Sequence, residues 1–179
     1  MTTQNRQQPL SDSKATESIR STAAFETFPW EEVPSLDKDL ILKLAECKFI
    51  DAGQNVIFCG PTDSAKTHLA NALSAIAQKA GYSVNLVHGA RLDARFSWQA
   101  CLESYLVDCD LLLVDDPQPT EHLRELLKQR RQRSTLLLTT LSPAQLLPQL
   151  IPSDARLAPL REAWASPILV EFKEPLAKN

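Results

Sequence analysis

Short runs of apolar residues recur along this chain and alternate with longer stretches in which apolar residues are spaced three or four apart. The short runs are typical of strands buried on both faces of a sheet, and they predict strands at 55–59, 82–87, 111–114, 135–139 and 168–172. The spaced pattern predicts amphipathic helices at 36–53, 66–80, 90–107 and 120–133, and a proline-punctuated helical stretch precedes the last strand. This alternation predicts a three-layer α/β domain with a mainly parallel five-stranded sheet.

The first 24 residues depart from this pattern. Residues 1–24 are rich in Gln, Ser, Thr and Asn and have almost nothing to bury, so we expect a disordered tail followed by one domain at 25–179. Phe25, Phe28, Trp30 and Val33 then bring large apolar groups into a polar stretch. They predict a strap that lies on the domain.

Composition places the protein among ordinary globular chains. It has 179 residues, a net charge of −3 and 23% charged residues, a balance that does not indicate nucleic-acid binding by the chain as a whole. No apolar run reaches the ~20 residues of a membrane span, and the N-terminus lacks the apolar core of a signal peptide, so we expect a cytosolic protein. The four cysteines are isolated from one another and from histidines, which favours buried free thiols over a metal site.

The segment between the first strand and the next helix carries the most informative chemistry. In the motif GxxxxGK[ST], successive backbone N–H groups wrap a phosphate, the lysine bridges two phosphates and the hydroxyl ligates Mg²⁺. Here Ala65 replaces the second glycine, and Asp63 stands where a flexible glycine is common and where its charge is unfavourable near phosphate. The alternative is a strand-turn-helix connection with an accidental lysine. The candidate loop consists of Gly60, Pro61, Thr62, Asp63, Ser64, Ala65, Lys66 and Thr67.

An acidic pair follows the third strand. Asp115 and Asp116 come directly after Leu111–Val114, at the strand end where ligands bind in open α/β sheets. One carboxylate can hold Mg²⁺ and the other can orient the attacking water in phosphoryl transfer. An acidic pair before a proline is also an ordinary turn, but its position after the loop, one helix and one further strand makes the pair more specific.

The stretches FIDAGQNVIFCGPTDSAKTHLANALSAIA, LLLVDD and EHLRELLKQRRQRSTLLLTTLSP together resemble the AAA+ ATPase core of bacterial helicase loaders and insertion-sequence transposition helpers, the DnaC/IstB type, with the DnaA-like regulator Hda as a near neighbour. The likeness covers roughly 25–172 and is densest around the loop and His68, so we count His68 with the loop among the candidate nucleotide-binding residues. It implies a P-loop fold that binds ATP and Mg²⁺. Carried over residue by residue, it implies phosphate contact by Lys66, Mg²⁺ contact by Thr67 and Asp115, catalysis by Asp116 and a sensor role for Thr140.

The chain also departs from this family. Only 23 residues separate Val87 from Leu111 (111 − 87 − 1), so we expect the helical insertion used by the family between these strands to be reduced or absent. We also expect a reduced or absent C-terminal lid, because the sequence stops about where the family's arginine-bearing lid would begin. The resemblance further implies an arginine finger supplied by a neighbouring subunit. Arg156 is the favoured candidate and Arg161 the alternative.

A basic stretch lies in the helix at 120–133. Arg124, Lys128 and Arg131 share a helical face opposite a leucine stripe, and this face could bind DNA phosphates without sequence specificity or an acidic partner. Its plainer interpretation is a solvated exterior paired with Glu121 and Glu125.

These observations support two functions of different classes. The first is an ATP-binding AAA+ protein of DNA replication, recombination or transposition, with weak ATP-dependent self-association and weak hydrolysis of ATP to ADP and phosphate. The second is a degenerate AAA+ adaptor or regulator that binds a protein partner with little or no ATPase activity. A small-molecule kinase is disfavoured, because the double-acidic strand end resembles that of ATPases more than that of phosphotransferases.

Overall fold

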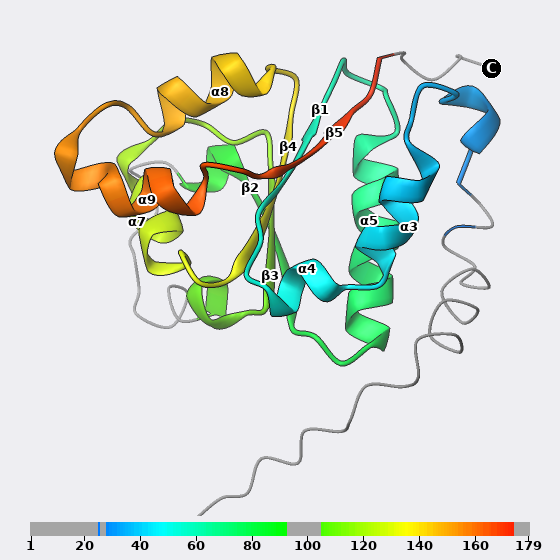
Figure 1. Cartoon of the computed structure of the whole chain (residues 1–179), viewed down its shortest axis with the longest axis horizontal. Coiled ribbons are helices and arrows are strands. Elements are labelled where there is room, and N and C mark those ends of the chain that lie inside the picture. The colour runs from blue at the N-terminus through cyan, green and yellow to red at the C-terminus, as the bar shows by residue number, and fades with distance from the viewer. Residues whose placement is uncertain (1–24, 26–27, 93–104, 174–179) are drawn as a thin grey trace, which may run out of the picture.

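The computed structural model describes Phe25, residues 28–92 and residues 105–173, and these form a three-layer α/β domain around one sheet (Figure 1). All strand pairs are parallel, and the strand order is β2-β3-β4-β1-β5. The three central strands are buried almost throughout, and the two edge strands are half exposed, which explains why the central runs are the most continuously apolar. The strands are β1 (Val56–Cys59), β2 (Val84–His88), β3 (Leu111–Asp115), β4 (Ser134–Thr139) and β5 (Ile168–Glu171).

Helices cover both faces of the sheet, as the alternating pattern predicts. One face packs against α3 (Lys38–Ala45), α4 (Lys48–Asp51) and α5 (Lys66–Lys79). The other packs against α7 (Glu121–Gln129), α8 (Pro143–Leu150) and α9 (Ala158–Ala163). Short 3₁₀ turns complete the described elements: η1 (Trp30–Glu32), η2 (Gly89–Leu92) and η3 (Ala155–Leu157).

The strap predicted from Phe25 onward packs on the α5 side of the sheet. Phe25, Phe28 and Val33 are each at most 5% exposed and belong to the same core cluster as Leu69 of α5. The indole Nε1 of Trp30 donates a hydrogen bond to the Phe25 carbonyl at 3.2 Å. The apolar residues of this polar stretch are therefore part of the core. Residues 1–24, the predicted tail, lie outside the described residues.

Two predicted helices are shorter in the structure. The helix predicted at 36–53 is two helices, because Cys47 has φ +60° and breaks the helical path between α3 and α4. The helix predicted at 120–133 ends at Gln129, where the Arg130 side chain turns into the core. Most of the helix predicted at 90–107 lies outside the described residues.

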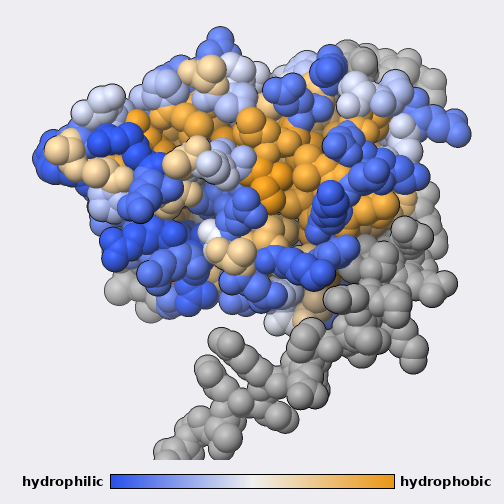
Figure 2. All heavy atoms as spheres, in the orientation of Figure 1, coloured by the Kyte–Doolittle hydropathy of each residue, from blue (hydrophilic) through white to orange (hydrophobic). Residues whose placement is uncertain are grey.

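The edge strand β5 leaves some apolar surface on the molecule. Leu169 is 42% exposed, and Figure 2 shows apolar side chains at the surface over β5, between the two helical layers.

Within the described ranges, no helix has both the length and the apolar character needed to cross a membrane. Cys47, Cys59 and Cys109 are buried free thiols, as expected, whereas Cys101 is not among the described residues.

Candidate nucleotide site

The loop that follows β1 begins with Gly60, and any other residue at this position would displace the neighbouring backbone. A Cβ on Gly60 would lie 2.2 Å from the Phe172 carbonyl oxygen. The Phe172 N–H donates to the Cys59 carbonyl at 2.8 Å, and the Gly60 N–H donates to the Thr139 carbonyl at 3.2 Å. The first residue of the loop is thus held between the ends of β4 and β5, at the C-terminal edge of the sheet.

Two residues of the loop adopt the left-handed conformation that glycine favours. Asp63 has φ +58° and Ala65 has φ +61°, and they flank the buried Ser64. These are the two positions at which the sequence departs from glycine, and the loop keeps the expected turn in spite of both replacements. Left-handed and right-handed residues in succession aim backbone N–H groups into one concavity, which is an anion-binding arrangement. The strain at an L-residue in this conformation is about 1–2 kcal/mol.

Lys66 begins α5 and folds its side chain back into the loop. Its Nζ donates to the Gly60 carbonyl at 2.8 Å, to the Pro61 carbonyl, and to the Ser64 hydroxyl oxygen at 3.0 Å. Only 9% of Lys66 is exposed, and burial lowers its pKa, an effect that Asp115 and, more weakly, Asp63 oppose. The ammonium group is held inside the loop, where phosphate oxygens can replace the carbonyl acceptors.

The acidic pair reaches the same edge of the sheet from β3. Asp115 is the last residue of β3. Side chains alternate between the two faces of a strand, so Asp115 is on the same face as Leu111 and Leu113, which belong to the core on the α5 side. Asp115 therefore faces the layer in which Lys66 lies, consistent with its effect on the Lys66 pKa. Only β4 separates β3 from β1, so the structure brings the loop and the pair together as the sequence predicts.

Asp116 is held by a contact that sequence reasoning missed. Its backbone has φ +52°, and its N–H donates to the Leu138 carbonyl at 3.0 Å. A Cβ on Gly89 would lie 2.1 Å from the Asp116 carbonyl oxygen, so the turn after β2 packs directly on the acidic pair. The signal in the sequence is a glycine immediately after a predicted strand.

Thr140 and His68 lie near the loop without a bond to it that would establish a role. Thr140 is exposed and follows the last residue of β4, Thr139, whose carbonyl accepts from Gly60. His68 is exposed in the first turn of α5, and its ring lies edge-on to Phe28 of the strap at 5.5 Å. The sensor role of Thr140 and the nucleotide contact of His68 stay predictions.

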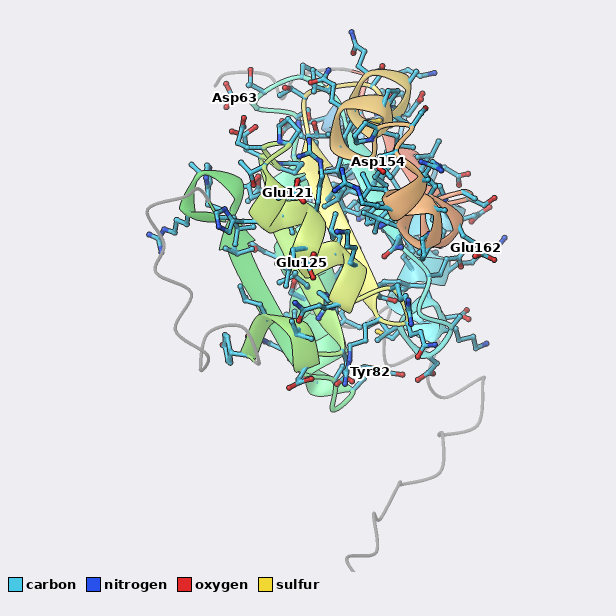
Figure 3. The ribbon with its side chains drawn as sticks, turned by 90° about the vertical axis from the view of Figure 1, so that its left-hand side faces the viewer. Asp63, Tyr82, Glu121, Glu125, Asp154 and Glu162 are labelled. Atoms are coloured by element: carbon cyan, nitrogen blue, oxygen red, sulfur yellow. The ribbon has the colours of Figure 1, made fainter. Side chains whose placement is uncertain are left out.

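Neither candidate finger contacts the loop of its own chain. Arg156 lies in η3, and its guanidinium forms an ion pair with Asp154 at 2.8 Å, which lowers the pKa of that carboxyl. Arg161 of α9 donates to the backbone carbonyls of Pro152 and Asp154. Both belong to the helical layer opposite α5, and Figure 3 shows Asp154 well apart from Asp63.

Much of the basic stretch makes contacts within the protein, and both ion pairs of the plainer interpretation are present, Arg124 with Glu121 at 3.3 Å and Lys128 with Glu125. The Nε of Arg124 donates to the Leu150 carbonyl at 2.9 Å and its terminal nitrogen to the Gln149 carbonyl, so Arg124 holds the C-terminus of α8. Lys128 pairs with Glu125 at 3.1 Å, as the plainer interpretation proposed, and Arg131 lies beyond the end of α7. A charge reversal at Arg124 would release α8 and would not be a clean test of DNA binding.

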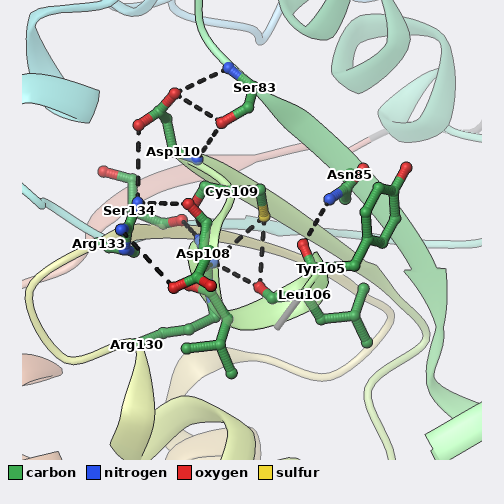
Figure 4. Close-up of polar contacts among 11 residues, drawn as sticks. Ser83, Asn85, Tyr105, Leu106, Asp108, Cys109, Asp110, Arg130, Arg133 and Ser134 are labelled. Atoms are coloured by element: carbon green, nitrogen blue, oxygen red, sulfur yellow. Dashed lines mark hydrogen bonds and ion pairs between the residues drawn. The ribbon is translucent and has the colours of Figure 1, made fainter. Parts of the chain in front are cut away.

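Arg130, in the same stretch, is 1% exposed. Its guanidinium donates to the carbonyls of Leu106, Cys109 and Ser134 and to the Cys109 sulfur (Figure 4). It also donates to the Val107 carbonyl and to the Thr135 hydroxyl. These contacts join the start of β4 to the segment that leads into β3.

The donor set fits a magnesium ion that is shared with phosphate. Within the described part of the chain, no group of three or more His, Cys, Asp or Glu side chains could hold a metal by itself. Thr67 and Asp115 offer oxygen atoms, the ligands that Mg²⁺ prefers, and Mg²⁺ in nucleotide sites is typically bound by one or two side chains together with substrate phosphates.

Comparison with known proteins agrees with this geometry. A family model described as IstB-like ATP binding protein matches residues 3–159. The ATP-binding protein of insertion sequence IS232 from Bacillus thuringiensis is 27% identical in an alignment of 126 positions that covers 63% of this chain and 50% of that protein. The chain spans about half the length of the curated relatives that it matches first.

Solved structures show the same fold. The structure of DnaI superposes with a TM-score of 0.61 at 14% identity and covers 90% of this chain and 93% of that one. The DnaC helicase loader superposes with a TM-score of 0.57 at 20% identity and covers 76% of this chain and 90% of that one.

Proposed function

Because this chain belongs to the family of IstB-like ATP-binding proteins, we propose that it binds ATP together with Mg²⁺ at the loop Gly60–Thr67 and hydrolyses it slowly. The observation that supports this most directly is the position of the Lys66 ammonium inside the loop, hydrogen-bonded to the Gly60 carbonyl and the Ser64 hydroxyl and facing Asp115. A lysine that merely began a surface helix would extend into solvent.

Each residue of the site has a distinct part in this proposal. The backbone N–H groups of the loop and the Lys66 ammonium bind the phosphates. The Thr67 hydroxyl and an Asp115 oxygen are the protein ligands of Mg²⁺, which supplies charge neutralisation at the phosphates when bound. The Asp116 carboxylate orients the attacking water, and Gly89 and Leu138 fix its backbone for this purpose.

Substitutions in the acidic pair test the division of roles. Asp115→Asn is expected to weaken Mg²⁺-dependent ATP binding by about tenfold or more, because it removes a charged metal ligand. Asp116→Asn is expected to retain ATP affinity and to slow hydrolysis by about 10²-fold or more, since asparagine tolerates the +52° φ but does not carry the charge. Calorimetric titration and a phosphate-release assay measure the two quantities. Identical behaviour of the two variants would contradict the assignment.

We further propose that ATP promotes weak self-association, with Arg156 reaching the nucleotide of a neighbouring copy, and that the protein acts with a replication, recombination or transposition protein. The Arg156 guanidinium is on the surface, and among the described residues its hydrogen bonds and ion pair go to Asp154, two residues earlier, so it can be transferred to a phosphate at small cost.

In sedimentation velocity, ATP with Mg²⁺ is expected to increase the sedimentation coefficient of the Asp116→Asn protein, in which hydrolysis is slowed. Arg156→Ala in that background is expected to remain monomeric, because the neighbouring nucleotide loses its charged contact. Arg131→Ala, which removes an exposed arginine outside the site, serves as the matched control and is expected to associate normally. Association that persists without Arg156 would assign the finger elsewhere.

A second candidate function is a nucleotide-independent adaptor. The observation that favours it is the pair of strained non-glycine residues, Asp63 and Ala65, within the loop. An adaptor would bind neither ATP nor ADP in the same titration, with or without Mg²⁺.

A further inference from the structure

The loop carries a negative charge of its own. Asp63 is exposed at the tip of the loop, at the end of the molecule away from Tyr82 (Figure 3), and it precedes Ser64, whose hydroxyl contacts the Lys66 ammonium at 3.0 Å. Its carboxylate therefore belongs to the same turn as the Lys66 ammonium, one residue from a group that the ammonium contacts, and its charge opposes the lowering of the Lys66 pKa by burial. The loop Gly60–Thr67 therefore contains one negatively charged side chain, Asp63, and one positively charged side chain, Lys66.

A phosphate group bound by Lys66 must lie within the electrostatic reach of Asp63. Like charges repel, and the repulsion is proportional to the charge on the ligand. Near neutral pH, free ATP carries roughly four negative charges and its complex with a divalent cation roughly two. Asp63 therefore penalises the free nucleotide about twice as strongly as the metal complex.

We propose that Asp63 makes this site selective for metal-complexed nucleotide over free nucleotide. The inference rests on the proposed function and adds a specificity-determining residue to it. In this protein Mg²⁺ then favours nucleotide binding as well as hydrolysis. Asp115 and Asp116 add negative charge at the same edge of the sheet, but Asp63 alone of the three belongs to the loop that wraps the phosphates.

The test is to measure the affinities of the wild-type protein and of Asp63→Asn for ATP, with Mg²⁺ and with a chelator. Asparagine tolerates the left-handed conformation, so this variant changes the charge and leaves the turn in place. We expect free ATP to bind about tenfold more tightly to the variant and the Mg²⁺ complex only about threefold more tightly, because the gain scales with ligand charge. Both gains should shrink in ~1 M salt, where the screening length falls to about 3 Å.

Two control variants show whether a change in ATP affinity comes from the charge at the loop or from another effect of the substitution. Ala65→Gly relaxes the second left-handed position without a charge change, and it is expected to alter both affinities by the same factor. Glu162→Gln removes an exposed carboxylate from α9, in the opposite helical layer (Figure 3), and is expected to leave both affinities unchanged.

The outcomes separate this inference from the proposed function. Equal gains for both forms of ATP in Asp63→Asn, or no gain, would overturn the role of Asp63, while Mg²⁺-dependent ATP binding that is lost in Lys66→Ala would still support the proposed function. Failure of the wild-type protein and of Asp63→Asn to bind either form of ATP would overturn both.

Discussion

Replacing Arg130 with methionine is expected to lower the free energy of unfolding by about 3–5 kcal/mol, because it leaves several carbonyl groups in the protein without their hydrogen-bond donor. Arg130 is 1% exposed, and its guanidinium donates to the carbonyls of Leu106, Cys109 and Ser134 (Figure 4) and to the Val107 carbonyl. Methionine fills much of the volume but leaves these carbonyls without donors, and each unsatisfied buried group costs about 1–3 kcal/mol.

The charge of Arg130 is compensated by backbone dipoles. None of the described hydrogen bonds of its guanidinium goes to a carboxylate, and several of its acceptors lie at the C-terminal end of the helical turn at 105–108, where carbonyl groups carry partial negative charge. Burial lowers the pKa of Arg130. The residue is a structural clamp that joins β4 to the segment entering β3, which ends in the acidic pair.

Urea denaturation measures this effect, with Arg131→Ala as the matched control. Arg131 is the next residue and is exposed, so its removal is expected to change stability by less than about 0.5 kcal/mol. Arg130→Lys keeps the charge, but lysine cannot reach all of the acceptors. Its free energy of unfolding is therefore expected to lie between those of the Arg130→Met and Arg131→Ala proteins. Equal stabilities of the Arg130→Met and Arg131→Ala proteins would show that the clamp contributes nothing.

Lys66→Ala is expected to abolish the stabilisation of the protein by nucleotide. At about 100 times its dissociation constant, ATP with Mg²⁺ should stabilise the wild-type protein by about 2.7 kcal/mol, or roughly 5–10 °C in melting temperature. The variant should show no such shift, because the ammonium that binds the phosphates is gone.

The unliganded stability of Lys66→Ala is expected to change by less than about 1 kcal/mol. The variant loses hydrogen bonds to the Gly60 and Pro61 carbonyls, but it also avoids the unfavourable burial of an ammonium, which is seen in the lowered pKa. Lys79→Ala, at the exposed C-terminal end of the same helix, should keep the full nucleotide shift in differential scanning fluorimetry. A nucleotide shift that survives in Lys66→Ala would place the ligand elsewhere.

Much of the site could be predicted because its parts are local in sequence. Gly60, Lys66 and Thr67 lie within the turn that leads from a strand into the next helix, and Asp115 and Asp116 lie at the end of the next strand but one. In a parallel sheet all strand ends of the same polarity meet at one edge, so these two segments come together once the strands are assigned. The role of Gly89 was missed because it depends on a contact between two turns that are distant in sequence. Gly89 follows β2, and the Asp116 backbone that it contacts follows β3.

The sequence by itself determined the order of strands and helices, the loop and the acidic pair, because apolar periodicity and turn chemistry act over a few neighbouring residues. Only the tertiary structure decided the roles of the arginines. Arg124, Arg130 and Arg131 are equally basic in the sequence, yet one holds α8, one is buried against backbone carbonyls and one is exposed. A long cationic side chain is placed by the carbonyl groups that other elements bring within its reach, and most of those that accept from Arg124 and Arg130 come from residues 21 to 26 positions away.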